Sequence, residues 1–425
     1  PSEPRSIYLL DLETGAKRRL TFPPEGERIG DGYPAVSPDG RHLAFLRGYG
    51  PGSQQLWLLS LGADGAPRGE PQRLIPDEAT MWGMDWAADG ASIIFSSNRG
   101  GTQGLWRVPL PAPGASAEPE RLTVGSDKAL FPSIARRGHR MAFAQGEAPL
   151  EIWRIPGPGS RIAAAPTLLI PRAFYPHFSA DGKRIAYSSD ASGTAEIWVC
   201  DSEGQNRIRW THLGGPGAAY PRWSPDGRKI AFTTNKAGGV QHVFVMDEGG
   251  ANLRQLTFGA SADSFPSWSA DGRSVYFASP RGERILQVWK VPAEGGEPQK
   301  VTRNGGMLAA ESADGRFLYY TGAGRSGIWR VPVGGGEEVL VVPDRHTYGR
   351  WALTREGIYL IDPAEDGATE FRRFDLVTGK VTLAARLPPA PRPHIFPEVS
   401  PNGEWILYPQ YNRFEFNIAL VENFR

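Results

Sequence analysis

The chain has 425 residues, and its 47 Lys and Arg side chains nearly balance its 46 Asp and Glu side chains, which leaves a formal net charge of +1. Because neither sign is in surplus, the composition excludes a surface that binds nucleic acid through overall charge. No run reaches the roughly 18 apolar residues of a transmembrane helix, and the single Cys200 excludes an internal disulfide or a Cys-rich metal site. We therefore expect a soluble globular protein of the cytoplasm or periplasm that contacts neither nucleic acid nor membrane.

Two short segments open the chain, Ile7 to Leu12 and Arg18 to Phe22, and we expect both to be β-strands. A turn motif then recurs: an apolar residue, Ser, a small residue or Pro, Asp and Gly, followed by an apolar run, as in Trp223 to Phe232. Asp can bond to its own backbone and Gly accepts a positive φ, so the motif predicts a tight β-hairpin. Its Asp position is filled in chain order by Asp39, Asp89, Arg137, Asp181, Asp226, Asp271, Asp314, Glu356 and Asn402.

Two more strands are predicted in each repeat. An apolar–aromatic pair such as Ile197-Trp198 stands about 15 to 18 residues after the Asp position, and an apolar–Thr pair such as Leu256-Thr257 often follows it. Four short strands that recur every 42 to 50 residues are typical of β-propeller blades, whereas two-helix repeats would need long helical periodicity. We therefore predict an all-β fold, a single β-propeller domain over residues 1–425 with nine four-stranded blades, or alternatively eight.

The two ends of the chain are expected to close this ring. The N-terminal segments look like outer strands only, whereas the C-terminal part offers three further strands at Pro397 to Ser400, Trp405 to Pro409 and Asn417 to Glu422. Together these segments would complete one blade and remove a sheet edge. Five candidate strands compete for four places, so either one strand is displaced or the ring has eight blades with an overhang.

The repeat resembles that of a known family. The segments Pro221 to Phe232 and Glu196 to Asp201 are similar to the TolB-like, WD40-like (PD40) propeller repeat, and the likeness extends over essentially the whole chain. The Asp position departs from the family pattern at Arg137, Glu356 and Asn402. The last third resembles C-terminal propellers of bacterial winged-helix regulators and serine/threonine kinases, which implies a sensor or scaffold module, either excised from a larger protein or solitary.

One position of the repeat varies in its chemistry while its neighbours do not. This channel position lies four residues before the Asp position and is filled by Ala35, Asp85, Ser133, His177, Arg222, Ser267, Ala310, Ala352 and Glu398. The innermost strands of a propeller line its central channel, so we expect Asp85, His177, Arg222 and Glu398 to form one polar ring there. Solvated ion pairs at a channel mouth, worth about 0 to 1 kcal/mol, are the alternative.

Aromatic residues two positions earlier in the repeat are interpreted mainly as wedges between blades. A ligand-facing rim is the alternative, with Tyr175 and with Trp82, which falls outside this pattern, as the candidate stacking surfaces. The recurring Asp residues are interpreted as turn residues rather than calcium ligands, because each blade contributes only one. The repeated Trp residues are expected to pack between blades.

The sequence favours a binding module over an enzyme. It contains no nucleophile elbow, no P-loop and no paired metal-ligand motif. We expect a non-catalytic, monomeric protein without cofactor or metal that binds a protein, a peptide or a small polar ligand at the channel mouth. A lyase or hydrolase that holds a metal with two or more of His177, His346 and His394 is one alternative, and a purely structural repeat array without a ligand is the other.

Overall fold

The computed structural model describes the chain except for residues 1–3, 24–29, 51–52, 76–80, 100–102, 111–116, 125–127, 148, 158–164, 215–216, 237–239, 284, 344–347, 388–395, 412–414 and 425. The described part is all-β apart from one short 3-10 turn, η1 (Glu248–Gly250). None of its helices has the length and apolarity to cross a membrane. The chain divides into two compact units, one made of Pro1–Glu147 with Phe414–Arg425 and the other of Ala148–Arg413.

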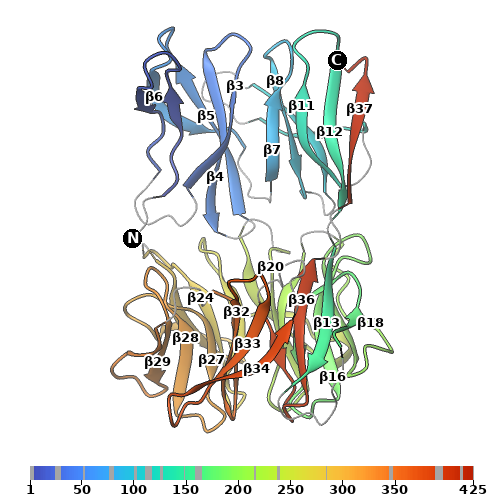
Figure 1. Ribbon diagram of the computed structural model, residues 1–425, viewed down its shortest axis with the longest axis vertical. Helices are drawn as coiled ribbons and strands as arrows, with labels where there is room; N and C mark the ends of the chain where they lie inside the picture. Colours follow the sequence, from blue (N-terminus) through green and yellow to red (C-terminus); the bar gives the residue numbers. More distant parts are fainter. Residues whose placement is uncertain are drawn as a thin grey trace. The chain divides into compact units, whose positions relative to one another are not determined.

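Unit 1 contains four sheets among its described residues. The hydrogen-bonded strand orders are β1-β2, β3-β4-β5-β6, β10-β9-β8-β7 and β11-β12-β37 (Figure 1). The strands are β1 (Tyr8–Leu10), β2 (Lys17–Arg19), β3 (Gly30–Val36), β4 (His42–Gly50), β5 (Ser53–Leu61), β6 (Pro67–Arg73), β7 (Met81–Trp86), β8 (Ser92–Ser97), β9 (Gly104–Pro109), β10 (Glu120–Arg121), β11 (Ala129–Ile134), β12 (Arg140–Glu147) and β37 (Glu415–Glu422).

Unit 2 contains six four-stranded sheets among its described residues. The first is ordered β14-β13-β36-β35, and the others take β15 to β34 four at a time in chain order. The first sheet and its two sequence neighbours are built from β13 (Leu150–Pro156), β14 (Thr167–Ile170), β35 (Glu398–Val399), β36 (Trp405–Tyr411), β15 (Ala173–Phe178), β16 (Arg184–Ser189), β17 (Glu196–Asp201), β18 (Ile208–Arg209), β19 (Ala219–Trp223), β20 (Lys229–Thr234), β21 (His242–Asp247) and β22 (Arg254–Gln255). The remaining three are built from β23 (Ser264–Trp268), β24 (Ser274–Ser279), β25 (Gln287–Pro292), β26 (Gln299–Lys300), β27 (Met307–Glu311), β28 (Phe317–Thr321), β29 (Ile328–Pro332), β30 (Val339–Val342), β31 (Trp351–Thr354), β32 (Gly357–Pro363), β33 (Thr369–Phe374) and β34 (Val381–Leu387).

The turn motif folds as the sequence predicts, and its Asp is a turn residue. At the first turn the Ser37 hydroxyl donates to Asp39 Oδ1 at 2.6 Å, and the backbone N–H of Arg41 donates to the same oxygen at 3.0 Å. These hydrogen bonds lower the pKa of Asp39. Gly40 follows with a φ of 74°, a value that glycine adopts without steric cost. Each of the nine predicted hairpins joins two neighbouring strands of one sheet.

Third and fourth strands are joined by a recurring contact that we call the threonine clip. At Val243 on β21, the backbone C=O accepts from the N–H of Leu256 at 2.8 Å, and the backbone N–H donates to Thr257 Oγ1 at 2.9 Å. An apolar residue and the following Thr therefore engage both backbone groups of one third-strand residue. The same clip is made on Ile7 by Leu20-Thr21, on Ile197 by Trp210-Thr211 and on Val288 by Val301-Thr302.

Apolar clusters join the sheets of unit 2 in cyclic order. Each cluster draws buried residues from two consecutive sheets, and the one containing Tyr359 and Tyr408 joins the β31–β34 sheet to the sheet that holds β36. The Trp residues contribute to this packing as expected, since Trp268 is 8% exposed and its indole N–H donates to the backbone oxygen of Arg222 on the preceding sheet at 3.0 Å. The blades of unit 2 are therefore held together face to face by their apolar side chains.

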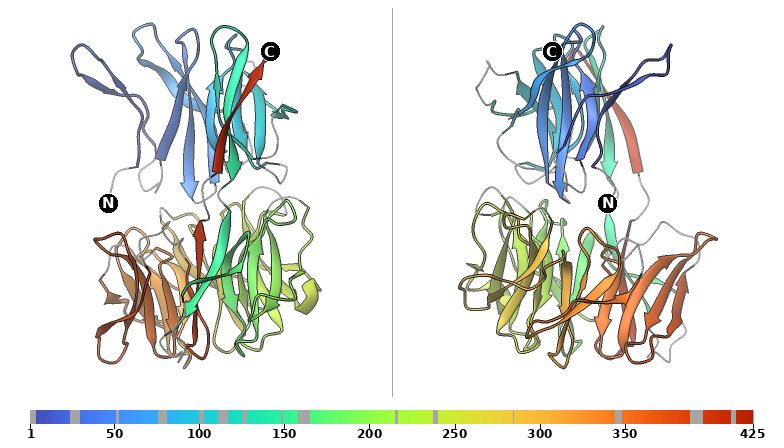
Figure 2. Two further views of the ribbon diagram at one scale, coloured as in Figure 1. Left: turned by 45° about the vertical axis from the view of Figure 1, so that its right-hand side comes forward. Right: turned by 90° about the vertical axis from the view of Figure 1, so that its left-hand side faces the viewer.

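The predicted closure of the ring is wrong. Strand β36 pairs with β13, from the pair Trp405 and Pro156 to the pair Tyr411 and Leu150. Strand β37 pairs with β12, and β1 pairs with β2. The N-terminal strands therefore do not complete a blade with the C-terminal ones, and the repeats are shared between two compact units instead of forming one nine-bladed ring. Figure 2 shows the separate courses of the last two strands, both in red. The repeats have nearly the same hydrogen-bonding pattern, so local sequence does not specify which strand a C-terminal strand joins.

Candidate functional site

The channel positions of unit 2 form a consistent series. His177, Arg222, Ser267, Ala310, Ala352 and Glu398 are all partly exposed, and the residue before each of them is buried. Side chains alternate between the two faces of a β-strand, so these positions face solvent within an otherwise packed set of inner strands. The charged and polar members lie on β35, β15 and β19, and the small members lie on β23, β27 and β31.

Three of the four predicted ring members lie close together. Glu398 Oε1 lies 3.9 Å from His177 Nε2, and Glu398 Oε2 lies 3.6 Å from Arg222 Nη1. The exposed fractions of their side chains are 16% for Glu398, 23% for His177 and 27% for Arg222. The inner strands β35, β15 and β19 thus bring an acid, an imidazole and a guanidinium to one place that solvent reaches.

The surroundings of these groups shift their protonation. Burial raises the pKa of Glu398 to about 7, although the charge of Arg222 and a backbone hydrogen bond from Phe178 oppose the shift. Burial, reinforced by the positive charge of Arg222, holds the pKa of His177 well below its ordinary range. The imidazole is therefore neutral near pH 7, and the carboxyl group of Glu398 is close to half protonated.

The tautomer of His177 follows from one hydrogen bond. The backbone N–H of Trp223, on the next inner strand, donates to His177 Nδ1 at 3.1 Å. A neutral imidazole that accepts at Nδ1 carries its proton on Nε2, which is the nitrogen that faces Glu398. Besides facing solvent, the channel position thus links the inner strands of neighbouring sheets.

Asp85 and Trp82 do not belong to this cluster, because both lie on β7 in unit 1. Asp85 Oδ2 accepts from the backbone N–H of Ile134 at 2.7 Å, and its Oδ1 accepts from the N–H of Trp86 at 2.8 Å. Asp85 therefore links two sheets of unit 1, as His177 does in unit 2. The predicted polar ring of four residues reduces to the three that unit 2 contains.

Tyr175 packs among aromatic rings of neighbouring inner strands. Its ring centroid lies 4.1 Å from that of Tyr220 and 5.0 Å from that of Phe396, and Tyr220 lies 4.7 Å from Phe265. Burial raises the pKa of both tyrosines. Tyr348 joins the same cluster through Phe265 and Phe396. The rings thus pack on one another beside the channel positions, at the start of the inner strands.

The backbone at these aromatic positions is unusual. Tyr175, Tyr220 and Phe265 have φ values of 55°, 57° and 57°, and the register of each inner strand shifts there. Such β-bulges redirect a side chain, and here they coincide with the convergence of the rings. Sequence analysis missed this conformation, although an aromatic residue two positions before the channel position recurs in the sequence.

Neither of the other histidines proposed for a metal can be placed, because His346 and His394 lie outside the described residues. Among the residues that the structure describes, no group of three His, Cys, Asp or Glu side chains has the arrangement to hold a metal ion. His177 has only Nε2 left for a ligand, since Nδ1 accepts from Trp223.

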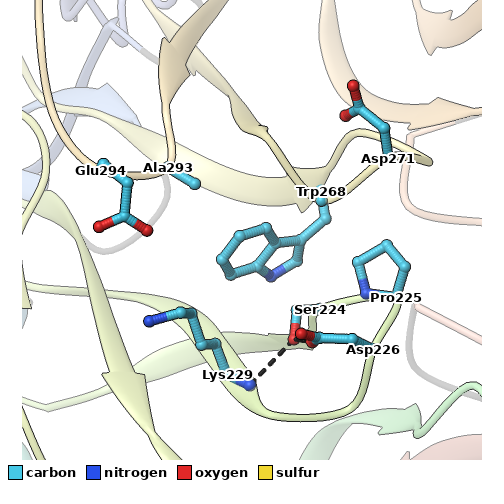
Figure 3. Close-up of a pocket in the computed structure, with 9 residues that line it drawn as sticks. Ser224, Pro225, Asp226, Lys229, Trp268, Asp271, Ala293 and Glu294 are labelled. Atoms are coloured by element: carbon cyan, nitrogen blue, oxygen red, sulfur yellow. Dashed lines mark hydrogen bonds between the residues drawn. The ribbon is translucent and has the colours of Figure 1, made fainter.

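A hollow also lies between the β19–β22 and β23–β26 sheets, where Trp268 stands among Lys229, Asp226, Asp271 and Glu294 (Figure 3). Its polar groups already have partners in the fold. Asp226 Oδ1 accepts from the Ser224 hydroxyl at 2.6 Å, and Lys229 Nζ lies 2.8 Å from Asp247 Oδ1. We therefore place the candidate site at the channel positions.

The comparisons with known proteins concern the same part of the chain. The model of the TolB beta propeller domain (PD40) matches residues 171–331. An uncharacterized protein of Agrobacterium fabrum is 29% identical over 143 residues, which are 34% of this chain and 44% of that relative's length.

Solved structures that align with this chain include TolB from Acinetobacter baumannii. It has 14% identity, the alignment covers 80% of this chain and 82% of that chain, and the TM-score is 0.43. Oligogalacturonate lyase from Vibrio parahaemolyticus has 13% identity, covers 90% and 96% of the two chains, and has a TM-score of 0.34. The family match supports the likeness seen in the repeat, and it does so for one part of the chain: residues 171–331 match the TolB beta propeller domain (PD40).

Proposed function

We propose that the chain is a non-catalytic binding module, and that the channel positions of unit 2 bind a peptide, a protein segment or a small polar ligand. The observation that carries the proposal is the series of six partly exposed positions, each preceded by a buried residue. Groups fixed on packed strands lose little freedom when a ligand binds, so the ordering cost of binding there is low.

The chemistry of the cluster favours a ligand with a carboxylate. A guanidinium has five N–H donors, yet the closest carboxylate to Arg222 among the described residues is that of Glu398, at 3.6 Å. That distance is longer than a hydrogen bond between charged groups, which is about 2.7 to 2.9 Å. Arg222 can therefore donate to a ligand carboxylate, and Glu398 in its protonated form can donate a further hydrogen bond to it.

The small side chains opposite the cluster fit this proposal. Ser267, Ala310 and Ala352 occupy the channel positions of the next three inner strands. A ligand that reached Arg222 would meet a hydroxyl and two methyl groups there, which project little from the strands. The cluster would then fix the polar end of the ligand, and the small residues would limit its width.

An enzyme is the second candidate, and one observation favours it. A carboxyl group with a pKa of about 7, such as that of Glu398, suits general acid–base catalysis at neutral pH. In such an enzyme Glu398 would exchange a proton with the substrate while Arg222 bound its negative charge. The lyase or hydrolase alternative therefore depends on Glu398, whereas the binding module depends on Arg222.

The proposal is tested with acetylated tripeptides that contain one Glu and with matched peptides that contain Gln, titrated calorimetrically into the full chain. We expect the Glu peptides to bind more tightly, and Arg222→Met to weaken their binding about tenfold or more, as for a lost charge-assisted hydrogen bond. Arg228→Met is the matched control, because Arg228 is exposed in the following turn and loses the same charge.

Equal affinity for Glu and Gln peptides, or binding by Arg222→Met equal to that of Arg228→Met, would refute the proposed site. Turnover of a peptide or oligosaccharide that is abolished by Glu398→Gln would instead establish the enzyme. Circular dichroism and the melting temperature of each variant show whether its fold is retained.

A further inference from the structure

One sheet lacks the last strand of its repeat. In the part of the chain that the structure describes, the β11-β12-β37 sheet has three strands, whereas the eight other sheets built on a turn motif have four. Strand β37 occupies the place of a third strand, beside β12, and no described strand pairs with its other edge. An unpaired edge is a template for another β-strand.

The register identifies the residue of β37 that corresponds to the clipped residues elsewhere. On β12, Ala142 pairs with Ser133, the channel-position residue of β11. Two residues further along β12, Ala144 pairs with Ile418 of β37. Ile197 has the same place on β17. Its partner on β16 is Ser188, which lies two residues beyond Ala186, the partner of the channel-position residue His177. Ile418 is therefore the counterpart of Ile197, a residue that carries a threonine clip.

The exposure of Ile418 sets it apart from all its counterparts. The side chain of Ile418 is 85% exposed, and on the same face of β37 Leu420 is 60% exposed and Phe416 is 43% exposed. The eight counterparts of Ile418 are exposed by at most 2% each, namely Leu56, Leu105, Ile152, Ile197, Val243, Val288, Ile328 and Phe371. An apolar side chain that is buried in every complete sheet is thus presented to solvent in this one.

The backbone of Ile418 is equally incomplete. At its counterparts Ile197 and Val243, the N–H and C=O groups point away from the second strand and are taken by the threonine clip. The register places the N–H and C=O of Ile418 in the same direction, toward the free edge. No side chain or backbone group of the described residues engages them, so this edge presents one donor and one acceptor with the spacing of a clip.

We propose that the free edge of β37 binds an extended segment of a separate polypeptide that carries an apolar–Thr pair. The N–H of the apolar residue would donate to the C=O of Ile418, and the Thr hydroxyl would accept from its N–H. The four clips in the described part of the chain show that this chemistry fits a third strand of the repeat. Main-chain hydrogen bonds would provide the affinity of such strand addition, and the apolar–Thr pair its specificity.

A second copy of this chain fits the edge less well. An edge-to-edge dimer would pair β37 with itself, and the sequence Glu415–Glu422 contains no Thr to accept from Ile418. The apolar–Thr pairs at Leu20-Thr21, Trp210-Thr211, Leu256-Thr257 and Val301-Thr302 already clip other strands of the same chain. The occupant is therefore assigned to another polypeptide.

The test uses a fluorescent peptide with the sequence of residues 252–259, which includes the Leu256-Thr257 pair, and measures anisotropy with the full chain. We expect saturable binding that weakens about tenfold or more when the Thr of the peptide is replaced by Val or its Leu is N-methylated. Ile418→Pro removes the outward N–H together with the Ile side chain and should weaken binding to the same extent. The matched control Ile418→Ala keeps that N–H and should change the affinity less than about threefold.

Three results would overturn the proposal. These are no binding up to about 1 mM peptide, equal binding of the Thr and Val peptides, and a dimer in sedimentation that Ile418→Pro dissociates, which would make a second copy the occupant. The modified peptides test the clip on the unaltered chain, so the proposal stays falsifiable even if Ile418→Pro fails to fold. Arg228→Met, which alters an exposed residue outside the channel positions, should bind the peptide as the unaltered chain does.

Discussion

The protonation of Glu398 should make the stability of the protein depend on pH in a direction opposite to that of most acids. The pKa of this carboxyl group is about 7 in the folded chain and 4.5 as its ordinary value. Between these values the folded chain retains a proton that the unfolded chain has released. The stabilisation is therefore complete below pH 4.5 and is lost as the pH rises to about 7.

The size of this effect follows from the difference in pKa. A shift of about 2.5 pH units corresponds to about 3 kcal/mol of unfolding free energy. Replacing Glu398 by Gln keeps the shape of the side chain and removes its titration. We expect the free energy of unfolding of the unaltered chain, relative to Glu398→Gln, to fall by about 3 kcal/mol between pH 4.5 and pH 8.

Urea unfolding of both proteins, followed by tryptophan fluorescence at half-unit steps of pH, measures this difference. The control is Glu404→Gln, which alters an exposed acid on the same hairpin and should give a difference that stays within about 0.5 kcal/mol over the range. A Glu398→Gln difference that is constant with pH, or that grows in favour of the unaltered chain as the pH rises, would show that Glu398 is not held in its protonated form by burial.

Three further predictions concern packing and buried polar groups, each measured by urea unfolding. Tyr220→Ala should lower the free energy of unfolding by about 3 to 5 kcal/mol, because it leaves a cavity in the aromatic cluster. Tyr33→Ala, at the same repeat position but 45% exposed, should lower it by less than about 1 kcal/mol. Equal losses would contradict the role assigned to the cluster. Asp31→Ala should cost about 3 kcal/mol, because Arg47, whose Nε lies 2.7 Å from Asp31 Oδ1, loses its buried carboxylate; a neutral result would contradict this. Thr257→Val should cost about 1 to 3 kcal/mol and speed hydrogen exchange of the clipped amide on β21, and unchanged exchange would count against the clip.

Much of the local structure could be predicted because its causes lie within a few residues. Where a turn motif contains both Ser and Asp, these residues bond to the backbone of the same turn, as Ser37 and Asp39 do, so the motif alone favours a hairpin. The channel position was recognisable for a similar reason. In an inner strand with alternating buried and exposed residues, the exposed channel position is free of packing constraints. The residue type therefore varies at that position from repeat to repeat.

The candidate site could be predicted only in part. The proximity of Arg222 and Glu398 depends on β35 lying beside β15, which in turn lies beside β19, although β35 is far from both of these strands in the chain. Sequence alone grouped Asp85 with them, because it has the same repeat position. The positive φ of Tyr175 was also missed, since the packing of neighbouring rings decides whether a bulge forms there.

The sequence by itself determined the four-stranded repeat, its Asp-Gly turns and the family likeness, since hydrogen bonds within each turn and the alternation of apolar residues encode them locally. Only the tertiary structure decided that β36 joins β13 and that β37 joins β12. Similar repeats offer equivalent edges to any C-terminal strand, and the choice among them depends on packing between residues hundreds of positions apart. The same long-range choice divides the repeats between two units and leaves Ile418 exposed on an edge with which no described strand pairs.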